Sequence, residues 1–415
     1  MKESAIYHKS KKLGVLLPGM GAVATTLIAG VYAIKKGLGV PVGSFTQLGF
    51  DAHGTPVRDR LDLVSIDDLV FGGWDIHGEN VYETAKRSRV LESDLLRQLE
   101  AELSSIKPMP AVFDQRYVKR LEAKEQKQGA SWWDLAQQIK DDIAQFKIHH
   151  GLERCVMVWC GSTEVFIEEG SSHTSVRRLE EAMKMNDPSI TPSMVYAYAA
   201  LTSGIPYANG SPNLSVDIPA MSELARECGI PIAGKDFKTG QTMIKTVLAP
   251  AFRARTLGLS GWFSTNILGN RDGEVLDDPE SFKTKEMSKL SVLETILDAE
   301  KSPELYGDIS HSVRINYYPP RGDNKEGWDS IDIFGWLGYP MQIKVDFLCR
   351  DSILAAPIVL DLILLLDIAA RKGERGTLEW MSFFFKAPMT QGTPAVHDLF
   401  AQESMLREAV DRLAR

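Results

Sequence analysis

The sequence contains few cysteines, only four among 415 residues. Cys155, Cys160, Cys228 and Cys349 include no Cys-x-x-Cys pair, which argues against a disulfide framework and against a cysteine zinc site. The histidines show no metal-ligand spacing either. Scattered thiols are typical of a reducing compartment, so we expect a cytoplasmic protein.

Excess positive charge is also missing. Lys plus Arg total 47 and Asp plus Glu total 55, which gives a formal net charge of −8. Binding to nucleic-acid phosphates or to an anionic membrane depends on a clustered excess of cations. We therefore expect neither a nucleic-acid nor a membrane partner. Any phosphate that the protein binds should lie in a local cationic pocket.

No uninterrupted apolar run is long enough to cross a bilayer, which takes about 20 helical residues. Asp361 interrupts the apolar segment 353–366, and Pro18 interrupts the segment 13–30. Ser162 does not stand in a G-x-S-x-G motif, so a serine-hydrolase elbow is not supported. The chain has instead the composition of a globular protein, with 44% hydrophobic and 25% charged residues.

The clearest local pattern stands at the front of the chain. Residues 13–17 (LGVLL) indicate a buried strand, 18–21 a tight turn, and 22–36 a helix closed by Gly37. Residues 40–45 are expected to form the next strand. A strand–helix–strand opening predicts an open parallel sheet.

Further elements can be placed from their periodicity. Helices are expected over 81–103, 129–145, 191–201, 288–298 and 355–372, and buried strands over 155–160, 205–208 and 231–234. Alternation over 262–266, 313–318 and 341–348 indicates antiparallel strands. The sequence thus predicts an α/β protein in which residues 1–242 form a first domain, 243–352 a separate middle domain, and 353–415 helices that return to the first domain.

Residues 19–24 (GMGAVA) fit the G-x-G-x-x-G/A pattern between a strand and a helix. The first two glycines would allow the turn and the approach of a pyrophosphate, and the third position keeps helix and strand close. A glycine turn that serves packing alone is the alternative. About 20 residues on, where a ribose-binding acid is expected, the chain has Phe45-Thr46-Gln47. Asp75 is the best candidate for that acid.

Five lysines in short motifs form a second pattern: Lys238, Lys285, Lys289, Lys325 and Lys386. The ordinary interpretation of each is a solvated surface residue, because lysine is rarely buried without a partner. Lys386 fits that interpretation least, since three phenylalanines precede it and burial would favour a neutral, basic amine. Asp272 and Asp351 are candidate countercharges. The residues alone predict a dinucleotide enzyme with a lysine-rich second site.

Several motifs follow one another in chain order. They are Gly-Trp-Asp-Ile at 73–76, Asn-Gly-Ser-Pro at 209–212, Asp-Phe-Lys-Thr-Gly-Gln-Thr at 236–242, Asn-Ile-Leu-Gly-Asn-Arg-Asp-Gly at 266–273, Ser-Lys at 288–289, Asp-Ser-Ile-Leu-Ala-Ala-Pro at 351–357 and Phe-Lys-Ala-Pro at 385–388. Together they resemble the inositol-3-phosphate synthase (myo-inositol-1-phosphate synthase) family over nearly the whole chain. The phosphate loop departs from the family's Gly-x-Gly-Gly-Asn-Asn-Gly, because it reads Gly-Met-Gly-Ala-Val-Ala-Thr here.

The resemblance implies an NAD-dependent isomerase that converts D-glucose 6-phosphate to 1D-myo-inositol 3-phosphate. The substrate is oxidised at C5, loses a C6 proton, closes C6 onto C1 and is reduced again at C5. The implied fold is a discontinuous Rossmann-like NAD-binding domain plus an α+β catalytic domain that builds a homotetramer. A metal or ammonium ion assists some family members, and the sequence leaves open whether a divalent or monovalent cation is used here.

The resemblance also assigns site residues by position. NAD contacts are implied for Gly19, Met20, Gly21, Ala22, Val23, Asp75, Ser162, Tyr196, Asp236, Thr239, Asp272 and Lys285. Substrate contacts are implied for Thr239, Asn266, Asn270 and Asp323. Catalytic roles are implied for Lys238, Lys285, Lys289, Lys325 and Lys386, with Asp351 orienting the lysines.

Individual roles follow from the same resemblance. Lys285 would accept a proton at the C5 hydroxyl, while Lys325 and Lys386 would stabilise the C1 oxygen during ring closure. Lys289 and Thr239 would hold substrate oxygens or the phosphate. Two alternatives stay open: an NAD-dependent dehydrogenase of a phosphorylated sugar, which would release reduced cofactor, and a catalytically silent NAD-binding regulator, which would need no lysine cluster.

Overall fold

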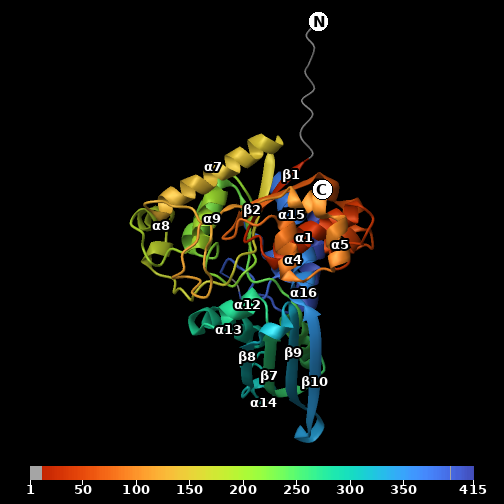
Figure 1. Cartoon of the computed structure of the whole chain (residues 1–415). Helices are drawn as coiled ribbons and strands as arrows, with labels where there is room; N and C mark the ends of the chain where they lie inside the picture. Colours follow the sequence, from red (N-terminus) through yellow and green to blue (C-terminus); the bar gives the residue numbers. More distant parts are fainter. Residues whose placement is uncertain (1–11, 393) are drawn as a thin grey trace.

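The computed structural model describes residues 12–392 and 394–415, with the backbone alone for residues 285–291. Within this part of the chain, seven parallel strands form the larger sheet, in the order β11-β6-β5-β4-β1-β2-β3. Strands β1 and β2 of this sheet are labelled in the upper half of Figure 1. The strands are β1 (Leu13–Pro18), β2 (Leu69–Asp75), β3 (Met109–Pro110), β4 (Arg154–Trp159), β5 (Tyr207–Asn209), β6 (Pro231–Gly234) and β11 (Gly376–Thr377). Apart from β11, this is the 3-2-1-4-5-6 order of a doubly wound dinucleotide-binding fold.

Alternate residues of β1 pack on opposite faces of this sheet. Val15 and Leu17 belong to one hydrophobic core and Leu16 to the other. The first core includes side chains of α1 (Ala22–Lys35), α4 (Val81–Ser88), α5 (Ser93–Gln98), α6 (Glu100–Ser104), α15 (Asp351–Arg371) and α16 (Leu399–Leu413). The second includes α7 (Trp132–His150), α8 (Val176–Lys184), α9 (Pro192–Thr202) and α10 (Pro219–Cys228). Because both faces are covered, the strands are continuously apolar.

Helix α15 is long and apolar enough to cross a membrane by length and composition, yet two thirds of its most apolar stretch is buried inside the protein. It packs against α1 and β4 as a core helix. Asp361 in its centre is 1% exposed and accepts hydrogen bonds from the hydroxyl of Ser44 (2.6 Å) and the N–H groups of Phe45 (2.7 Å) and Thr46 (2.9 Å). This acid therefore ties the loop after α1 to the core.

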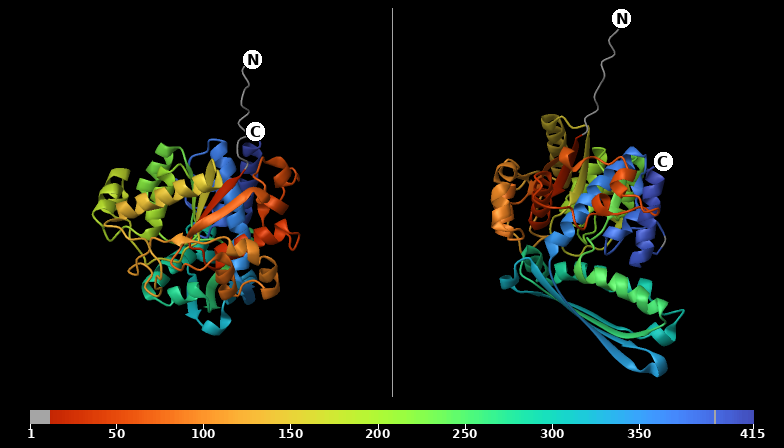
Figure 2. Two further views of the ribbon diagram at one scale, coloured as in Figure 1. Left: turned by 45° about the horizontal axis from the view of Figure 1, so that its top comes forward. Right: turned by 90° about the vertical axis from the view of Figure 1, so that its right-hand side faces the viewer.

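A second sheet has the order β10-β9-β7-β8 in the described residues. Its strands are β7 (Gly258–Leu268), β8 (Ser310–Tyr317), β9 (Asn324–Phe334) and β10 (Pro340–Arg350). The helices α11 (Gly240–Ala254) and α13 (Pro279–Ile296) contribute to the core on one face, around Trp262 and Ile331. The right view of Figure 2 shows a helix lying along that face. The opposite face carries exposed side chains such as Trp328.

Three expectations about the elements are wrong. Residues 40–45 form no strand, because Pro41 cannot donate to a ladder and Gly39 and Gly43 interrupt the apolar run; the next helix is α2 (Phe45–Leu48). The expected helix 81–103 is divided into α4, α5 and α6. The first of these ends where Arg89 takes a left-handed conformation (φ 54°). In the second sheet, β7 and β8 pair in parallel rather than antiparallel.

The chain leaves the large sheet after β6 and returns to it with α15 and β11. The predicted class, an α/β fold with a discontinuous parallel-sheet part, is therefore confirmed. The expected boundaries at 242/243 and 352/353 each fall near the start of a connecting helix, α11 and α15. They stay a prediction.

Candidate active site

The turn after β1 lies at the point where the strand order reverses. Gly19 has a φ of 86°, and its N–H donates to the carbonyl of Trp74 at the end of β2 (2.8 Å). A Cβ on Gly19 would lie 2.4 Å from the backbone nitrogen of Gly161, which follows β4. A cavity of about 900 Å³ opens at this crossing, where doubly wound folds bind their ligands.

The N-terminus of α1 fits a dinucleotide pyrophosphate. Gly19, Gly21, Ala22 and Val23 line the cavity, whereas Met20 is buried beneath it. No side chain caps α1 at Gly21, and a Cβ added there would meet no atom within 4 Å. Open space next to uncapped N–H groups at a positive helix end suits a bound anion.

Asp75 ends β2 beside this turn and lines the cavity. Its Oδ1 accepts the N–H of His77 (3.0 Å). Burial raises the pKa of Asp75, against the opposing effect of Arg271 and Arg87. Asp75 is further along the sequence from the glycine turn than the usual 20 residues or so. Its place at the end of β2 is nevertheless the one from which an acid reaches the ribose of a bound dinucleotide.

The end of β4 supplies the facing wall, with Ser162, Thr163 and Glu164. Glu164 is 1% exposed, and its carboxylate accepts the N–H (2.9 Å) and the hydroxyl (2.6 Å) of Ser193 at the start of α9. Burial raises the pKa of Glu164 to about 7. Tyr196, one turn further along α9, also lines the cavity, and its hydroxyl accepts the N–H of Val112 (3.0 Å).

A buried ion pair stands on the same cavity wall. The amine of Lys386 lies 3.1 Å from Oδ1 of Asp236, and both residues line the cavity. Thr239 lines it as well and is the N-cap residue of α11, whose end no side chain caps. A cation and a helix N-terminus thus face one space, which favours an anionic ligand.

Acidic and amide groups complete the wall near the second sheet. Asp323 accepts the amide of Asn270 (2.9 Å) and the hydroxyl of Ser352 (3.0 Å), and burial raises its pKa. Oδ2 of Asp351 lies 3.3 Å from the amine of Lys325. Of these residues, Asn270, Asp323, Ser352 and Asp351 line the cavity, together with Asp272, while Lys325 lies behind Asp351.

Some of the predicted site residues lie elsewhere or cannot be placed. The amine of Lys238 donates to the side chain of Gln402 in α16 and does not reach the cavity wall. Asn266 is buried but does not line the cavity, and neither of its amide atoms has a hydrogen-bond partner among the described residues. The side chains of Lys285 and Lys289 lie outside the described residues.

The structure adds Glu164 and Arg271 to the candidate residues. Arg271 stands between Asn270 and Asp272 at the start of α12 (Arg271–Leu276). A signal existed for Glu164, because it closely follows the apolar strand β4, which ends at Trp159, and polar groups at the carboxyl ends of parallel strands meet at one edge. In the described part of the chain, no group of three or more His, Cys, Asp or Glu residues is arranged to hold a metal ion.

The strand order, the glycine turn and the acid that ends β2 define a Rossmann-type dinucleotide-binding protein. A family model described as myo-inositol-1-phosphate synthase matches residues 13–411. The chain is 54% identical over 407 residues to inositol-3-phosphate synthase 1 of Bacteroides thetaiotaomicron. This alignment covers 96% of this chain and 95% of that protein. This chain therefore belongs to the myo-inositol-1-phosphate synthase family.

More distant relatives lead to the same family assignment. Inositol-3-phosphate synthase of Saccharomyces cerevisiae is 32% identical, over 96% of this chain and 84% of that protein. The crystal structure of inositol-3-phosphate synthase from Caenorhabditis elegans matches with a TM-score of 0.90 at 28% identity, over 98% of this chain and 86% of that chain. The predicted family is confirmed, and these relatives favour the predicted synthase over both alternatives.

Proposed function

We propose that this chain converts D-glucose 6-phosphate to 1D-myo-inositol 3-phosphate and that NAD is used and regenerated in each turnover. The observation that carries the proposal is that one cavity holds both the glycine turn after β1 and the buried Lys386–Asp236 pair. A phosphate, an enolate and a developing alkoxide are all anionic, so fixed cations next to them lower the barrier. A simple hydride transfer would not require this arrangement.

The first sheet supplies the cofactor contacts in this proposal. The N–H groups of Gly21 and Ala22 would hold the pyrophosphate, and Asp75 would accept a ribose hydroxyl. Ser162 and Tyr196 would border the nicotinamide. Bound NAD supplies the hydride acceptor for C5 and later returns the hydride.

The second set of residues acts on the sugar. Lys386 would neutralise the C1 oxygen while C6 closes onto C1, with Lys325 assisting from behind Asp351. The uncapped end of α11 at Thr239 would receive the phosphate, together with Lys289. Lys285 would take the proton from the C5 hydroxyl. Asn270 and Asp323 would contact sugar hydroxyls, while Lys238, whose amine lies on Gln402, would act only by holding its own segment.

Product identification tests the function directly. Purified protein is incubated with glucose 6-phosphate and catalytic NAD, and the products are followed by ³¹P NMR and by absorbance of the reduced nicotinamide. We expect inositol phosphate without net reduced cofactor. Stoichiometric release of reduced cofactor would favour a dehydrogenase, and no turnover with retained NAD binding would favour a regulator.

Three further properties belong to the proposal. We infer a homotetramer built through the open face of the second sheet, where Trp328 and Leu348 are exposed, and through the turn between β9 and β10, where Trp336 is 87% exposed. Light scattering after size-exclusion chromatography tests it. We infer a cytoplasmic location from the four free thiols. Dependence on a divalent cation or on ammonium is tested by activity after chelation and after ammonium removal.

A further inference from the structure

One buried contact joins the cofactor wall to the helix that carries two of the predicted lysines. The hydroxyl of Thr284 in α13 donates to the backbone carbonyl of Glu164 (3.1 Å), and Thr284 is 7% exposed. Glu164 continues the cavity wall formed by Ser162 and Thr163. Lys285 is the residue that follows Thr284 in the chain.

The carbonyl that accepts this bond is held in place on both sides. The carboxylate of Glu164 is bound to the N–H and the hydroxyl of Ser193 (2.9 and 2.6 Å). The N–H of Glu164 donates to Oδ1 of Asn213 (2.8 Å). A buried network in which each member is satisfied makes a rigid support.

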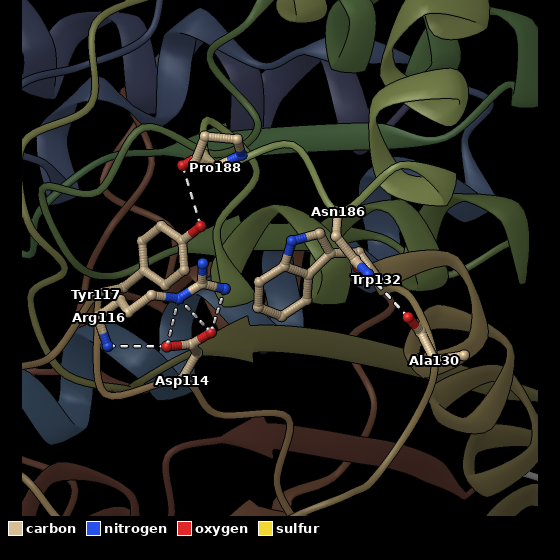
Figure 3. Close-up of polar contacts among 7 residues, drawn as sticks. All are labelled: Asp114, Arg116, Tyr117, Ala130, Trp132, Asn186 and Pro188. Carbon is tan, nitrogen blue, oxygen red and sulfur yellow. Dashed lines mark hydrogen bonds and ion pairs between the residues drawn. The ribbon is translucent and has the colours of Figure 1, made fainter.

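The next residue of the loop is braced as well. The N–H of Val165 donates to the carbonyl of Tyr117 (2.8 Å). Figure 3 shows the hydroxyl of Tyr117 directed at the carbonyl of Pro188, a bond of 3.0 Å. The ring of Tyr117 packs edge-on against Trp132, with 5.9 Å between centroids, and the backbone N–H of Trp132 donates to Oδ1 of Asn186 (2.9 Å). The loop therefore rests on a fixed frame.

Two more contacts hold the first half of α13 to this loop. The N–H of Phe166 donates to the carbonyl of Glu280 (3.3 Å). The amine of Lys283 lies 4.3 Å from the centroid of the Phe166 ring. Of the three contacts, only the one from Thr284 is a buried side-chain bond adjacent to Lys285.

We propose that Thr284 is a positioning residue: its bond to the Glu164 carbonyl fixes the rotation and depth of α13 against the cofactor wall, and thereby the place from which Lys285 acts. The proposal rests on the proposed function. Without the hydroxyl, Val292 and Leu293 of α13 still pack in the core beneath the second sheet. The distance from α13 to the cavity, however, is no longer fixed. Misplacement of a reacting group lowers the rate of chemistry more than it lowers ground-state binding.

The test compares three variants of the full-length protein. Thr284→Val removes the hydroxyl at nearly constant volume, and Thr284→Ser keeps it. Ser281→Ala is the matched control, because Ser281 is buried one turn earlier in α13 and its hydroxyl has no hydrogen-bond partner among the described residues. We expect Thr284→Val to lower kcat by about tenfold or more while KM for glucose 6-phosphate and the Kd for NAD change by less than about threefold. Thr284→Ser and Ser281→Ala should stay near wild type.

Full activity of Thr284→Val, or equal losses in Thr284→Val and Ser281→Ala, would overturn the proposal. If Thr284→Val fails to fold, Thr284→Ala removes the same hydroxyl and is judged by the same split between kcat and KM. Failure of the proposed function looks different, since the wild-type protein would then form no inositol phosphate.

Discussion

The amine of Lys386 lies 3.1 Å from Oδ1 of Asp236, and both side chains are buried. The two residues are 150 positions apart in the chain. Their backbones are paired too, because the N–H of Lys386 donates to the carbonyl of Asp236 (2.7 Å) and the N–H of Lys238 donates to that of Phe384 (2.8 Å). A cation held at both its backbone and its side chain does not have to reorganise when an anion forms beside it.

Replacement of this cation tests its role. We expect Lys386→Met to lower turnover by about 10²–10³-fold, the usual effect of removing a group that stabilises a developing oxyanion. NAD binding, followed by fluorescence titration, should change little, since the glycine turn and Asp75 are untouched. Lys235→Met is the control, because Lys235 pairs with Asp217 (2.6 Å) and does not line the cavity. Equal activities of the two variants would remove Lys386 from the mechanism.

Substitution of the two glycines of the turn should affect different properties, folding stability for Gly19 and NAD affinity for Gly21. Gly19→Ala brings a Cβ to 2.4 Å from the Gly161 backbone at a φ of 86°, so we expect a loss of roughly 2–5 kcal/mol in the free energy of unfolding. Gly21→Ala meets no protein atom within 4 Å, so folding should be normal. Its methyl group enters the cavity, and NAD affinity should fall at least about tenfold, or 1.4 kcal/mol. Urea unfolding and NAD titration of both variants separate the two effects; matching behaviour would contradict this account.

The front of the fold could be predicted because its signals are local. The apolar run, the glycine turn and the helix after it are observed as β1 and α1. The partner strand β2 could not be found in this way, since Gly72 and Gly73 have low strand propensity. Gly73 stands there because a Cβ would lie 2.1 Å from the carbonyl of Leu17. Such a requirement comes from the neighbouring strand and leaves no local pattern.

The loop after α1 offers a test of what holds this front unit to the core. Asp361→Ala would leave the hydroxyls of Ser44 and Thr46 and the N–H groups of Phe45 and Thr46 without the acceptor they share. We expect the free energy of unfolding to fall by about 3–5 kcal/mol. Asp361→Asn keeps one acceptor oxygen and should lose less. Urea denaturation measures both, and an Asp361→Ala variant as stable as Asp361→Asn would refute the assignment.

The site was less predictable than the fold, because its residues come from distant segments. Motif positions identified Lys386 and Asp236, but the direction of each side chain depends on tertiary structure. Lys238 illustrates this, since its amine donates a hydrogen bond to Gln402 of α16 and does not reach the cavity. For Glu164 the sequence offers only its place shortly after the apolar strand β4. Its support of α13 becomes visible where its loop meets α9 and α13.

The buried carboxyl of Glu164 gives a prediction about pH. Burial raises its pKa from 4.5 to about 7, so the folded protein retains a proton that the unfolded chain has already released. Stability from this group is therefore present below pH 4.5, is lost as the pH rises towards 7, and then stays constant. The loss over this window is of the order of 3 kcal/mol, since each pKa unit corresponds to about 1.4 kcal/mol.

Glu164→Gln removes the titration while it keeps the shape of the side chain. The difference in unfolding free energy between wild type and Glu164→Gln, measured in urea from pH 4.5 to pH 8, should move against the wild type as the pH rises and should level off above pH 7. Other groups titrate equally in both proteins and cancel in the difference. A flat difference between wild type and Glu164→Gln would mean that the Glu164 carboxylate is ionised at little cost, and that the support beneath Thr284 is more solvated than its burial indicates.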